Sequence, residues 1–335
     1  MSRAGNAPLR VPSASSEPLA SVLRILQLDG GEGPDCFVGT SLPQLGGRVY
    51  GGQVMAQALL AAAATVPGAA VCGATSGVDD AARLPHSVHA VFLRPGALDV
   101  PLEFRVERLH DGRSFSRRRT AVYQGGEAIM TLVSSFQVEQ IGLEFADSMP
   151  AGVPGPGELK SAIELFRTVE HPVAKFLGKT LAMDVRHVDS PLYVSRPQER
   201  GSSQLLWMRT RGDVPAGVCQ TVARALLLYT CDQVMLEPVL RGHGIHWLEP
   251  GLSLATLDHS MWFHGDVDAA SWHLYQQDTP AASGGRGLAR ASIYAPDGRL
   301  VASASQEGMV RVPGDDPAQA GRESFLDTPP AGPSK

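Results

Sequence analysis

The sequence predicts an α+β fold made of two repeats, each with a long central helix wrapped by an antiparallel sheet. Two stretches, 53–64 and 222–236, are apolar on nearly every side and are typical of buried helices. A series of short strand-like runs, separated by turn signals, follows each of them. Similar motifs recur in the same order in both halves of the 335-residue chain, which indicates a duplicated unit.

Composition and charge exclude several classes of protein. With 43% hydrophobic and 19% charged residues the chain is typical of globular proteins, and its net charge of −5 shows no nucleic-acid footprint. No apolar run reaches the ~18 residues of a membrane helix, and residues 1–8 lack the apolar region of a secretory signal. The cysteines have no paired short spacing for zinc: Cys36, Cys72, Cys219 and Cys231. We therefore expect a cytoplasmic protein with no membrane span and no nucleic-acid partner.

The first repeat is expected at 17–148, after a disordered tail at 1–16. A helix begins after Ser16, and the glycine-rich run 46–52 leads into the buried helix 53–64. The glycines let another backbone or a ligand approach the helix start, and close packing explains them equally well. Strand-like runs are expected as follows: 37–39, 86–93, 102–109, 115–123 and 128–138, the last two joined by a hairpin at 124–127.

The second repeat is expected at 181–312, between a linker at 149–180 and a disordered tail at 313–335. Within the linker, the stretch from Leu159 to about Lys179 is polar and permits a helix. Its strand-like runs precede and follow the helix 222–236: 182–188, 204–210, 254–264, 272–277, 287–294 and 300–312. Pro296-Asp297-Gly298 supplies the last hairpin turn. Two such units predict one long sheet wrapped around two central helices.

The run 254–264 is the strongest candidate for a functional strand. It combines Thr256, Asp258 and two histidines with Trp262 and a phenylalanine, a composition poorly suited to plain core. The alternative is a half-exposed edge strand. The run also shares a motif with the first repeat: His86-Ser87 corresponds to His259-Ser260. In each repeat an arginine follows that motif by the same interval: Arg113 and Arg286.

These motifs resemble the type II acyl-CoA thioesterases, a family with a double hotdog fold. The pieces that carry the resemblance run in unbroken order over roughly 18–312: Tyr50-Gly51-Gly52-Gln53-Val54, His86-Ser87-Val88-His89, Phe92-Leu93-Arg94-Pro95-Gly96, Asp111-Gly112-Arg113-Ser114-Phe115, Ser135-Phe136-Gln137, Leu257-Asp258-His259-Ser260-Met261-Trp262-Phe263-His264 and Gln306-Glu307-Gly308. The chain departs from the family in its tails and in an extra stretch near Gly73–Arg83, which could alter the substrate entrance.

The resemblance implies that Asp232, Thr256 and Gln306 are the catalytic residues. Their types agree with thioester hydrolysis, because a carboxylate can accept a proton from water, a hydroxyl can relay it, and an amide can orient water or face the oxyanion. Asp232 also stands out without the resemblance, since an unpaired carboxylate in an apolar helix is costly. A structural ion pair or a helix end at Cys231 are the alternatives. Taken alone, Thr256 and Gln306 are ordinary strand and surface residues.

The remaining site residues follow from the same resemblance and from charge. Asp258 and His259 look catalytic, but they are expected to lie behind the catalytic residues and to brace the strand by hydrogen bonds. Cys231, in an apolar helix, is expected to be inert core. Substrate contacts, including contacts to the phosphates of coenzyme A, are expected from Gly51, Gly52, His86, Arg94, Arg113 and Arg286. We expect no metal and no cofactor.

The sequence thus predicts an acyl-CoA thioesterase that releases free fatty acid and coenzyme A. The absence of a Gly-x-Ser-x-Gly motif argues against an α/β-hydrolase esterase. Two alternatives remain: a hotdog hydratase or dehydratase, and a non-catalytic acyl-thioester binding protein. Against the first, Asp258 and His259 are adjacent and so alternate across a strand. A homodimer or homotetramer is expected, because long sheets with free edges commonly pair.

Overall fold

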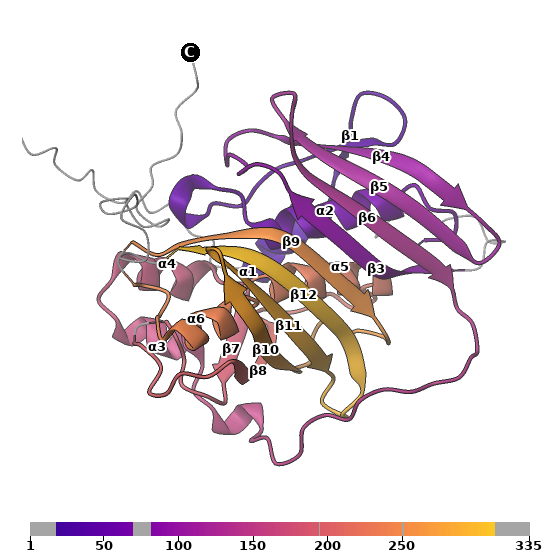
Figure 1. Cartoon of the computed structure of the whole chain (residues 1–335). Helices are drawn as coiled ribbons and strands as arrows, with labels where there is room; N and C mark the ends of the chain where they lie inside the picture. Colours follow the sequence, from indigo (N-terminus) through magenta and orange to yellow (C-terminus); the bar gives the residue numbers. More distant parts are fainter. Residues whose placement is uncertain (1–17, 70–81, 194, 250, 312–335) are drawn as a thin grey trace, which may run out of the picture.

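The computed structural model describes residues 18–69, 82–193, 195–249 and 251–311, and it shows one continuous antiparallel sheet with helices on its inner face (Figure 1). The twelve strands run in the order β1-β2-β4-β5-β6-β3-β9-β12-β11-β10-β8-β7. The elements of the first repeat are α1 (Pro18–Ile25), β1 (Asp29–Gly30), β2 (Cys36–Gly39), η1 (Leu45–Gly47), α2 (Gly51–Ala63), β3 (Arg83–Phe92), β4 (Leu102–Asp111), β5 (Phe115–Gln124) and β6 (Glu127–Val138).

The second repeat has the same arrangement around its own central helix. Its elements are β7 (Met183–His187), β8 (Ser203–Thr210), α5 (Gln220–Cys231), α6 (Glu237–His243), β9 (Ser253–Phe263), β10 (His273–Ser283), β11 (Arg286–Tyr294) and β12 (Leu300–Arg311). The predicted α+β architecture of two wrapped helices and one long sheet is therefore confirmed. The tails, and the extra stretch up to residue 81, lie outside the described residues.

Strands β3 and β9 join the two half-sheets. β9 pairs with β12 on one side and with β3 on the other, so the edge-strand alternative for this run is wrong. Val88 is the register partner of Met261, and the offset that aligns His86 with His259 also aligns these two residues. A local two-fold axis therefore passes through the junction, as expected for duplicated units.

Helices α2 and α5 form the centre of the core. In α2 every residue after Gly51 is buried, and α5 is buried from Thr221 to Cys231. The two helices pack on each other at one end through Tyr50 and Tyr229, whose rings meet edge to face at 5.0 Å. Burial of their apolar surface stabilises the fold by about 25 cal/mol per Å².

The segment predicted as a linker at 149–180 is largely helical. It contains η2 (Pro156–Glu158), α3 (Ala162–Thr168) and α4 (Pro172–Thr180). Ser161 caps α3 by accepting from the N–H of Ile163, and Pro172 opens α4. Both helices are too short for a clear periodic signal, yet each buries apolar side chains in the core. The segment is thus a structural element of the second half.

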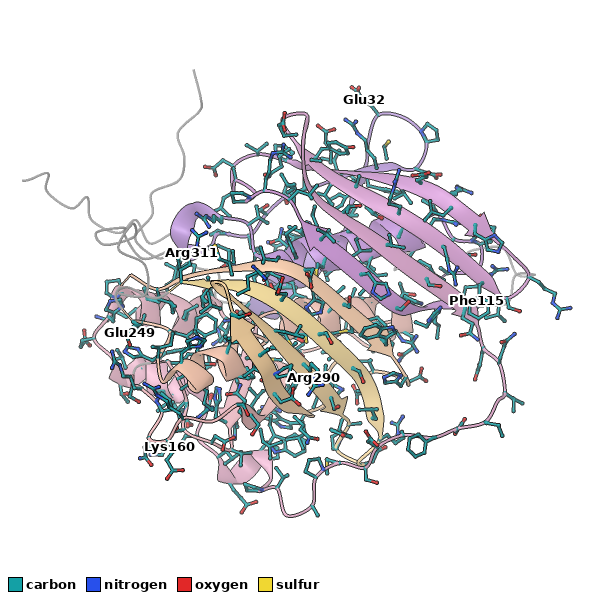
Figure 2. All side chains as sticks on the ribbon, viewed as in Figure 1. Glu32, Phe115, Lys160, Glu249, Arg290 and Arg311 are labelled. Atoms are coloured by element: carbon teal, nitrogen blue, oxygen red, sulfur yellow. The ribbon has the colours of Figure 1, made fainter. Side chains whose placement is uncertain are left out.

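The outer face of the sheet is polar over much of its area but carries exposed apolar side chains near the junction. Arg290 projects from the outer face of β11 and pairs with Asp278 on β10 at 2.8 Å (Figure 2). Val91 is 47% exposed and Trp262 is 38% exposed. In the described part of the chain, every helix is too short or too polar to span a bilayer.

His273 makes folding sensitive to acid. Its imidazole is 5% exposed on β10, and burial lowers its pKa to about 4 from 6.5, with Asp268 opposing the shift. An unfolded chain binds a proton at this site near pH 6.5, whereas the folded chain binds it only near pH 4. The free energy of unfolding should therefore fall by about 2 kcal/mol between pH 7 and pH 5 through this group alone.

Denaturant unfolding of the wild type and of His273→Gln at both pH values measures this contribution. The variant should lose about 2 kcal/mol less than the wild type between pH 7 and pH 5. An equal loss in both proteins would show that His273 takes no part in the acid sensitivity.

Candidate active site

A cavity of about 440 Å³ opens between the two repeats and brings the predicted catalytic residues together. Asp232, Thr256 and Gln306 line one wall, beside the start of α2 at Gly51. Apolar side chains from both repeats and from α3 and α4 make up most of the remainder, including Val54, Phe92, Ile129, Met130, Phe166, Val173, Ala174, Leu177, Leu236, Trp247 and Leu254. The cavity therefore suits a largely apolar ligand with one polar reacting group.

A chain of hydrogen bonds links the polar side chains of this wall. The hydroxyl of Thr256 donates to Oδ1 of Asp232 at 3.1 Å and accepts from Nε2 of Gln306 at 3.1 Å. Oε1 of Gln306 accepts from Nδ1 of His259 at 2.7 Å. The second carboxylate oxygen of Asp232 accepts the backbone N–H of Gly52 at 2.8 Å. Each donor has an acceptor, so the direction of every bond is determined.

A β-bulge places Thr256 on the same face as Gln306. Gln306 is the register partner of His259, whereas Gly308, two residues on, is the partner of Thr256. Leu257 is therefore an extra residue on β9, and it shifts the alternation of faces by one position. Without the bulge, Thr256 and His259, three residues apart, would point to opposite faces.

Asp232 lies at the end of α5 and not inside a longer helix. The predicted helix 222–236 is too long: α5 ends at Cys231, and Asp232 is its C-cap residue and is half-buried. Its carboxylate reaches the N-terminus of α2, where the N–H group of Gly52 and the positive end of the helix dipole stabilise its charge. This placement costs less than full burial and leaves the carboxylate facing the cavity.

The glycines at the start of α2 allow this close approach. A Cβ atom on Gly52 would lie 2.4 Å from the carbonyl oxygen of Tyr229, and one on Gly51 would lie 2.9 Å from Oδ2 of Asp232. The hydroxyl of Tyr50 donates to the same Tyr229 carbonyl at 2.7 Å. Close packing and the approach of another backbone therefore explain these glycines, and the approach of a ligand stays a prediction.

His259 is fully buried and neutral. Burial lowers its pKa, and the nearby Asp232 carboxylate opposes this shift without reversing it. Because its Nδ1 donates to Gln306, the imidazole exists as the Nδ1–H tautomer. Burial also raises the pKa of Cys231 well above its ordinary value, which makes its thiol a poor nucleophile.

Asp258, unlike His259, lies on the outer face of β9. Its Oδ1 accepts the backbone N–H of Glu307 at 3.3 Å, so it braces the pairing of β9 with β12. The two adjacent residues therefore project from opposite faces of one strand and cannot act on the same substrate atoms.

The predicted substrate contacts fall into two groups. Gly51 and Arg94 line the cavity, and Gly52 binds the carboxylate beside it. Arg94 is exposed at the mouth, where it pairs with Glu127 at 3.2 Å. The remaining three lie outside the cavity lining. His86 bonds Ser135 at 2.8 Å, Arg113 is exposed in the β4–β5 turn, and Arg286 pairs with Glu307 at 3.1 Å.

Sequence reasoning missed two parts of the site. Arg48 is exposed at the mouth of the cavity, and nothing in its local sequence distinguishes it from a solvated arginine. Helices α3 and α4 contribute Phe166, Val173 and Ala174 to the lining. The stretch from Leu159 to about Lys179 permits a helix but is polar, and the Pro/Gly-rich run before it favours a linker.

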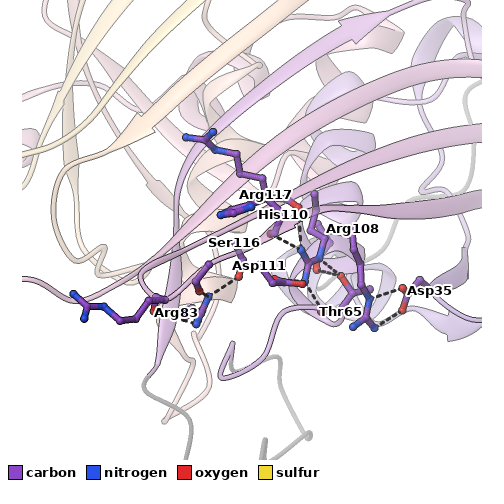
Figure 3. A network of polar contacts seen from close by, with 12 residues as sticks. Asp35, Thr65, Arg83, Arg108, His110, Asp111, Ser116 and Arg117 are labelled. Atoms are coloured by element: carbon purple, nitrogen blue, oxygen red, sulfur yellow. Dashed lines mark hydrogen bonds and ion pairs between the residues drawn. The ribbon is translucent and has the colours of Figure 1, made fainter.

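The corresponding position of the first repeat carries no carboxylate. Alignment of the two central helices by their Ala-Leu-Leu runs places Thr65 where the second repeat has Asp232. The hydroxyl of Thr65 accepts from Nε of Arg118 at 2.7 Å, and this fully buried guanidinium pairs with Asp111 at 2.8 Å (Figure 3). An ion pair between Arg118 and Asp111 thus occupies the end of α2 in the first repeat. The candidate catalytic side chains all come from the second repeat.

Comparison with known proteins gives consistent matches over both repeats. Residues 182–309 match the family model described as acyl-CoA thioesterase, and residues 40–137 match the acyl-CoA thioesterase N-terminal domain. Acyl-CoA thioesterase 2 of Haemophilus influenzae is 33% identical over 79% of this chain and 88% of its own length.

Solved structures agree with these matches. An acyl-CoA thioesterase II from Mycobacterium marinum is 32% identical, with a TM-score of 0.66 over 88% of this chain and 99% of its own. A protein from Alicyclobacillus acidocaldarius described as having a hot dog fold superimposes with a TM-score of 0.67 at 16% identity, over 88% of this chain and 98% of its own. The second likeness concerns the fold alone and agrees with the double hotdog expected from the sequence.

Proposed function

This chain belongs to the acyl-CoA thioesterase family and is an acyl-CoA thioesterase, and from that premise we propose that a water molecule activated by Asp232 performs the hydrolysis. The observation that carries the proposal is the hydrogen-bond chain from His259 through Gln306 and Thr256 to Asp232 at the wall of an apolar cavity. It joins a proton acceptor to two groups that can hold a water molecule in front of a thioester carbonyl.

In the proposed reaction, the water oxygen attacks the carbonyl carbon while Asp232 accepts its proton. Thr256 and Gln306 orient the water through their hydroxyl and amide groups. The oxyanion develops near the start of α2, where the N–H group of Gly51 has no intrahelical acceptor and the helix dipole is positive. Collapse of the tetrahedral intermediate breaks the carbon–sulfur bond, and Asp232 returns its proton to the leaving sulfur. No acyl-enzyme forms.

His259 acts in this proposal as a positioning residue. The amide of Gln306 has two possible orientations, and only one of them places Nε2 toward Thr256. The Nδ1–H group of His259 donates to Oε1 and so selects that orientation. With Nε2 donating to its oxygen, the hydroxyl of Thr256 is left to donate to Asp232. Burial keeps the imidazole neutral and preserves this direction.

The coenzyme A part of the bound substrate is expected to extend out of the cavity through its mouth. Arg48 and Arg94 are exposed there on neighbouring loops, tied together by the bridge between Arg48 and Ala97. Guanidinium groups bind phosphates well, and these two supply positive charge where the nucleotide would emerge. His86, Arg113 and Arg286, which lie outside the cavity lining, are weaker candidates for such contacts and stay predictions.

The geometry favours hydrolysis over hydration of the acyl chain. A hydratase that used Asp258 and His259 as an acid–base pair would need both side chains on one face of β9, and they lie on opposite faces. A binding protein without activity is the other alternative. A carboxylate, hydroxyl and amide joined by hydrogen bonds in the cavity give it little support.

Thiol release from a panel of acyl-CoAs tests the proposal, with Thr256→Val and Thr256→Ser as paired variants. Valine has the shape of threonine but no hydroxyl, so kcat should fall by about 10-fold to 100-fold, which corresponds to the roughly 1–3 kcal/mol of one lost hydrogen bond to a buried group. Serine keeps the hydroxyl and should retain most of the activity. Tight acyl-CoA binding by the wild type with no thiol release would instead favour the binding protein.

Assembly and location stay predictions. The exposed apolar side chains near the β3–β9 junction support a homodimer or homotetramer, which light scattering would test. The cytoplasmic location rests on sequence composition, and cell fractionation would test it.

A further inference from the structure

We propose that helices α3 and α4 form the wall that limits the length of the acyl chain, and that this wall excludes acyl chains that end in a second acidic group. This inference rests on the proposed function and deepens it. The helix pair belongs to the segment between the two repeats, so the acyl end of the cavity is built separately from the catalytic strands. Substrate range can then change without disturbing the chemistry.

The lining of the cavity has an exposed part with two arginines and a buried part that is largely apolar. Arg48 and Arg94 are exposed at the open end, and Asp232 lies on the wall of the same cavity. Phe166 of α3 and Ala174 of α4 line the buried part and are 3% and 2% exposed, and in this proposal they mark the closed end of the cavity. Phosphates favour the open end and methylenes the closed end, so the acyl chain points toward α3 and α4.

A buried polar network keeps this closed end rigid. Glu237 is fully buried, and it accepts from Nε1 of Trp247 at 2.9 Å and bonds Nε2 of His187 at 2.7 Å. Tyr193, which also lines the cavity, packs edge to face against both His187 and Phe166. These ring contacts hold the side chains of Phe166 and Tyr193 in defined orientations. A rigid wall predicts a sharp cut-off in chain length and not a gradual decline.

The charges of the lining indicate an acyl chain without a second acidic group. Of the described residues that line the cavity, the charged ones are Arg48, Arg94 and Asp232. None of them belongs to α3 or α4. Of the described residues, the buried part also holds the hydroxyl of Tyr193, which has no hydrogen-bond partner, but it holds no cation. A carboxylate at the far end of a dicarboxylic acyl chain would therefore be buried there without a counter-charge, which is strongly unfavourable.

Ala174→Phe is the variant that tests the wall. A phenyl ring at this buried position on α4 fills the closed end and shortens the space for the chain. Burial of each methylene contributes about 0.8 kcal/mol, or about a fourfold change in kcat/KM, until the chain reaches the wall. We expect kcat/KM for the longest accepted chains to fall at least about 10-fold, with short-chain values changed less than about twofold.

Two further variants separate this effect from general damage. Lys175→Phe adds the same ring to the exposed face of α4, and it should leave the chain-length profile unchanged. Leu177→Ala enlarges the closed end and should move the optimum toward longer chains. In the wild type, a dicarboxylic acyl-CoA should react at least about 10-fold more slowly than the monocarboxylic substrate of equal length.

Binding measurements distinguish failure of this inference from failure of the proposed function. Titration of the same acyl-CoA series into Asp232→Asn, with and without Ala174→Phe, reports chain-length preference without turnover. A selective loss of affinity for long chains supports the wall even if the wild type releases no thiol. Equal losses at all lengths, or an unchanged profile in both assays, would overturn the inference.

Discussion

Replacing Asp232 by asparagine is expected to lower kcat by at least about 100-fold, the usual contribution of general base catalysis. Asparagine has the shape of aspartate, and its amide oxygen can still accept the N–H group of Gly52. Asparagine cannot take a proton from water. Its amide nitrogen would also face the hydroxyl of Thr256, which in the wild type donates to the carboxylate. The loss should therefore appear in kcat, with KM and the unfolding temperature nearly unchanged.

Asp278→Asn is the matched control for this experiment. Asp278 is an exposed carboxylate on β10 that pairs with Arg290 on the outer face of the sheet. The same change of charge there should alter kcat by less than about twofold. If Asp232→Asn kept the wild-type kcat, the thioesterase function would stand, but another group would have to activate the water.

Replacing Gly52 by alanine is expected to damage both stability and activity. The added Cβ would lie 2.4 Å from the carbonyl oxygen of Tyr229 and 2.8 Å from the ring of Tyr50. The backbone of Tyr229 and the hydrogen-bonded ring of Tyr50 cannot easily move away from the added Cβ. Helices α2 and α5 must therefore separate. Overpacking of this kind costs about 1–3 kcal/mol or more. The separation also weakens the N–H bond to Asp232, so kcat should fall together with the free energy of unfolding.

Gly178→Ala provides the comparison. Gly178 lies within α4, and a Cβ there would meet only the Cβ of Phe166, at 3.6 Å, which is ordinary van der Waals contact. Alanine is the better helix former, so this variant should be as stable as the wild type or more stable by up to about 1 kcal/mol. Denaturant unfolding and thiol release, measured on both variants, test whether Gly52 is needed for stability and for activity. A Gly52→Ala protein with wild-type stability and kcat would show that the helices need not approach so closely.

Most elements of the fold could be predicted from the sequence. The hydrophobic pattern, the hairpin turns and the repeated motifs indicate the strands, the two central helices and the duplication, because these signals depend on neighbours along the chain. Two parts of the chain differ from this prediction. Helix α5 stops at Cys231, and the segment 149–180 contains α3 and α4. Short helices after a Pro/Gly-rich run give a weak periodic signal, because they are stabilised mainly by tertiary packing.

The sequence by itself determined the family, the fold class and the three residue types proposed for the chemistry. Only the tertiary structure decided how they meet. The bulge at Leu257 turns Thr256 toward Gln306, and the absence of side chains at Gly51 and Gly52 lets α2 approach Asp232. The acyl wall arises from helices distant in sequence from both. The register of the strands and the approach of α2 to Asp232 depend on contacts between residues far apart along the chain. Local sequence patterns therefore do not predict them.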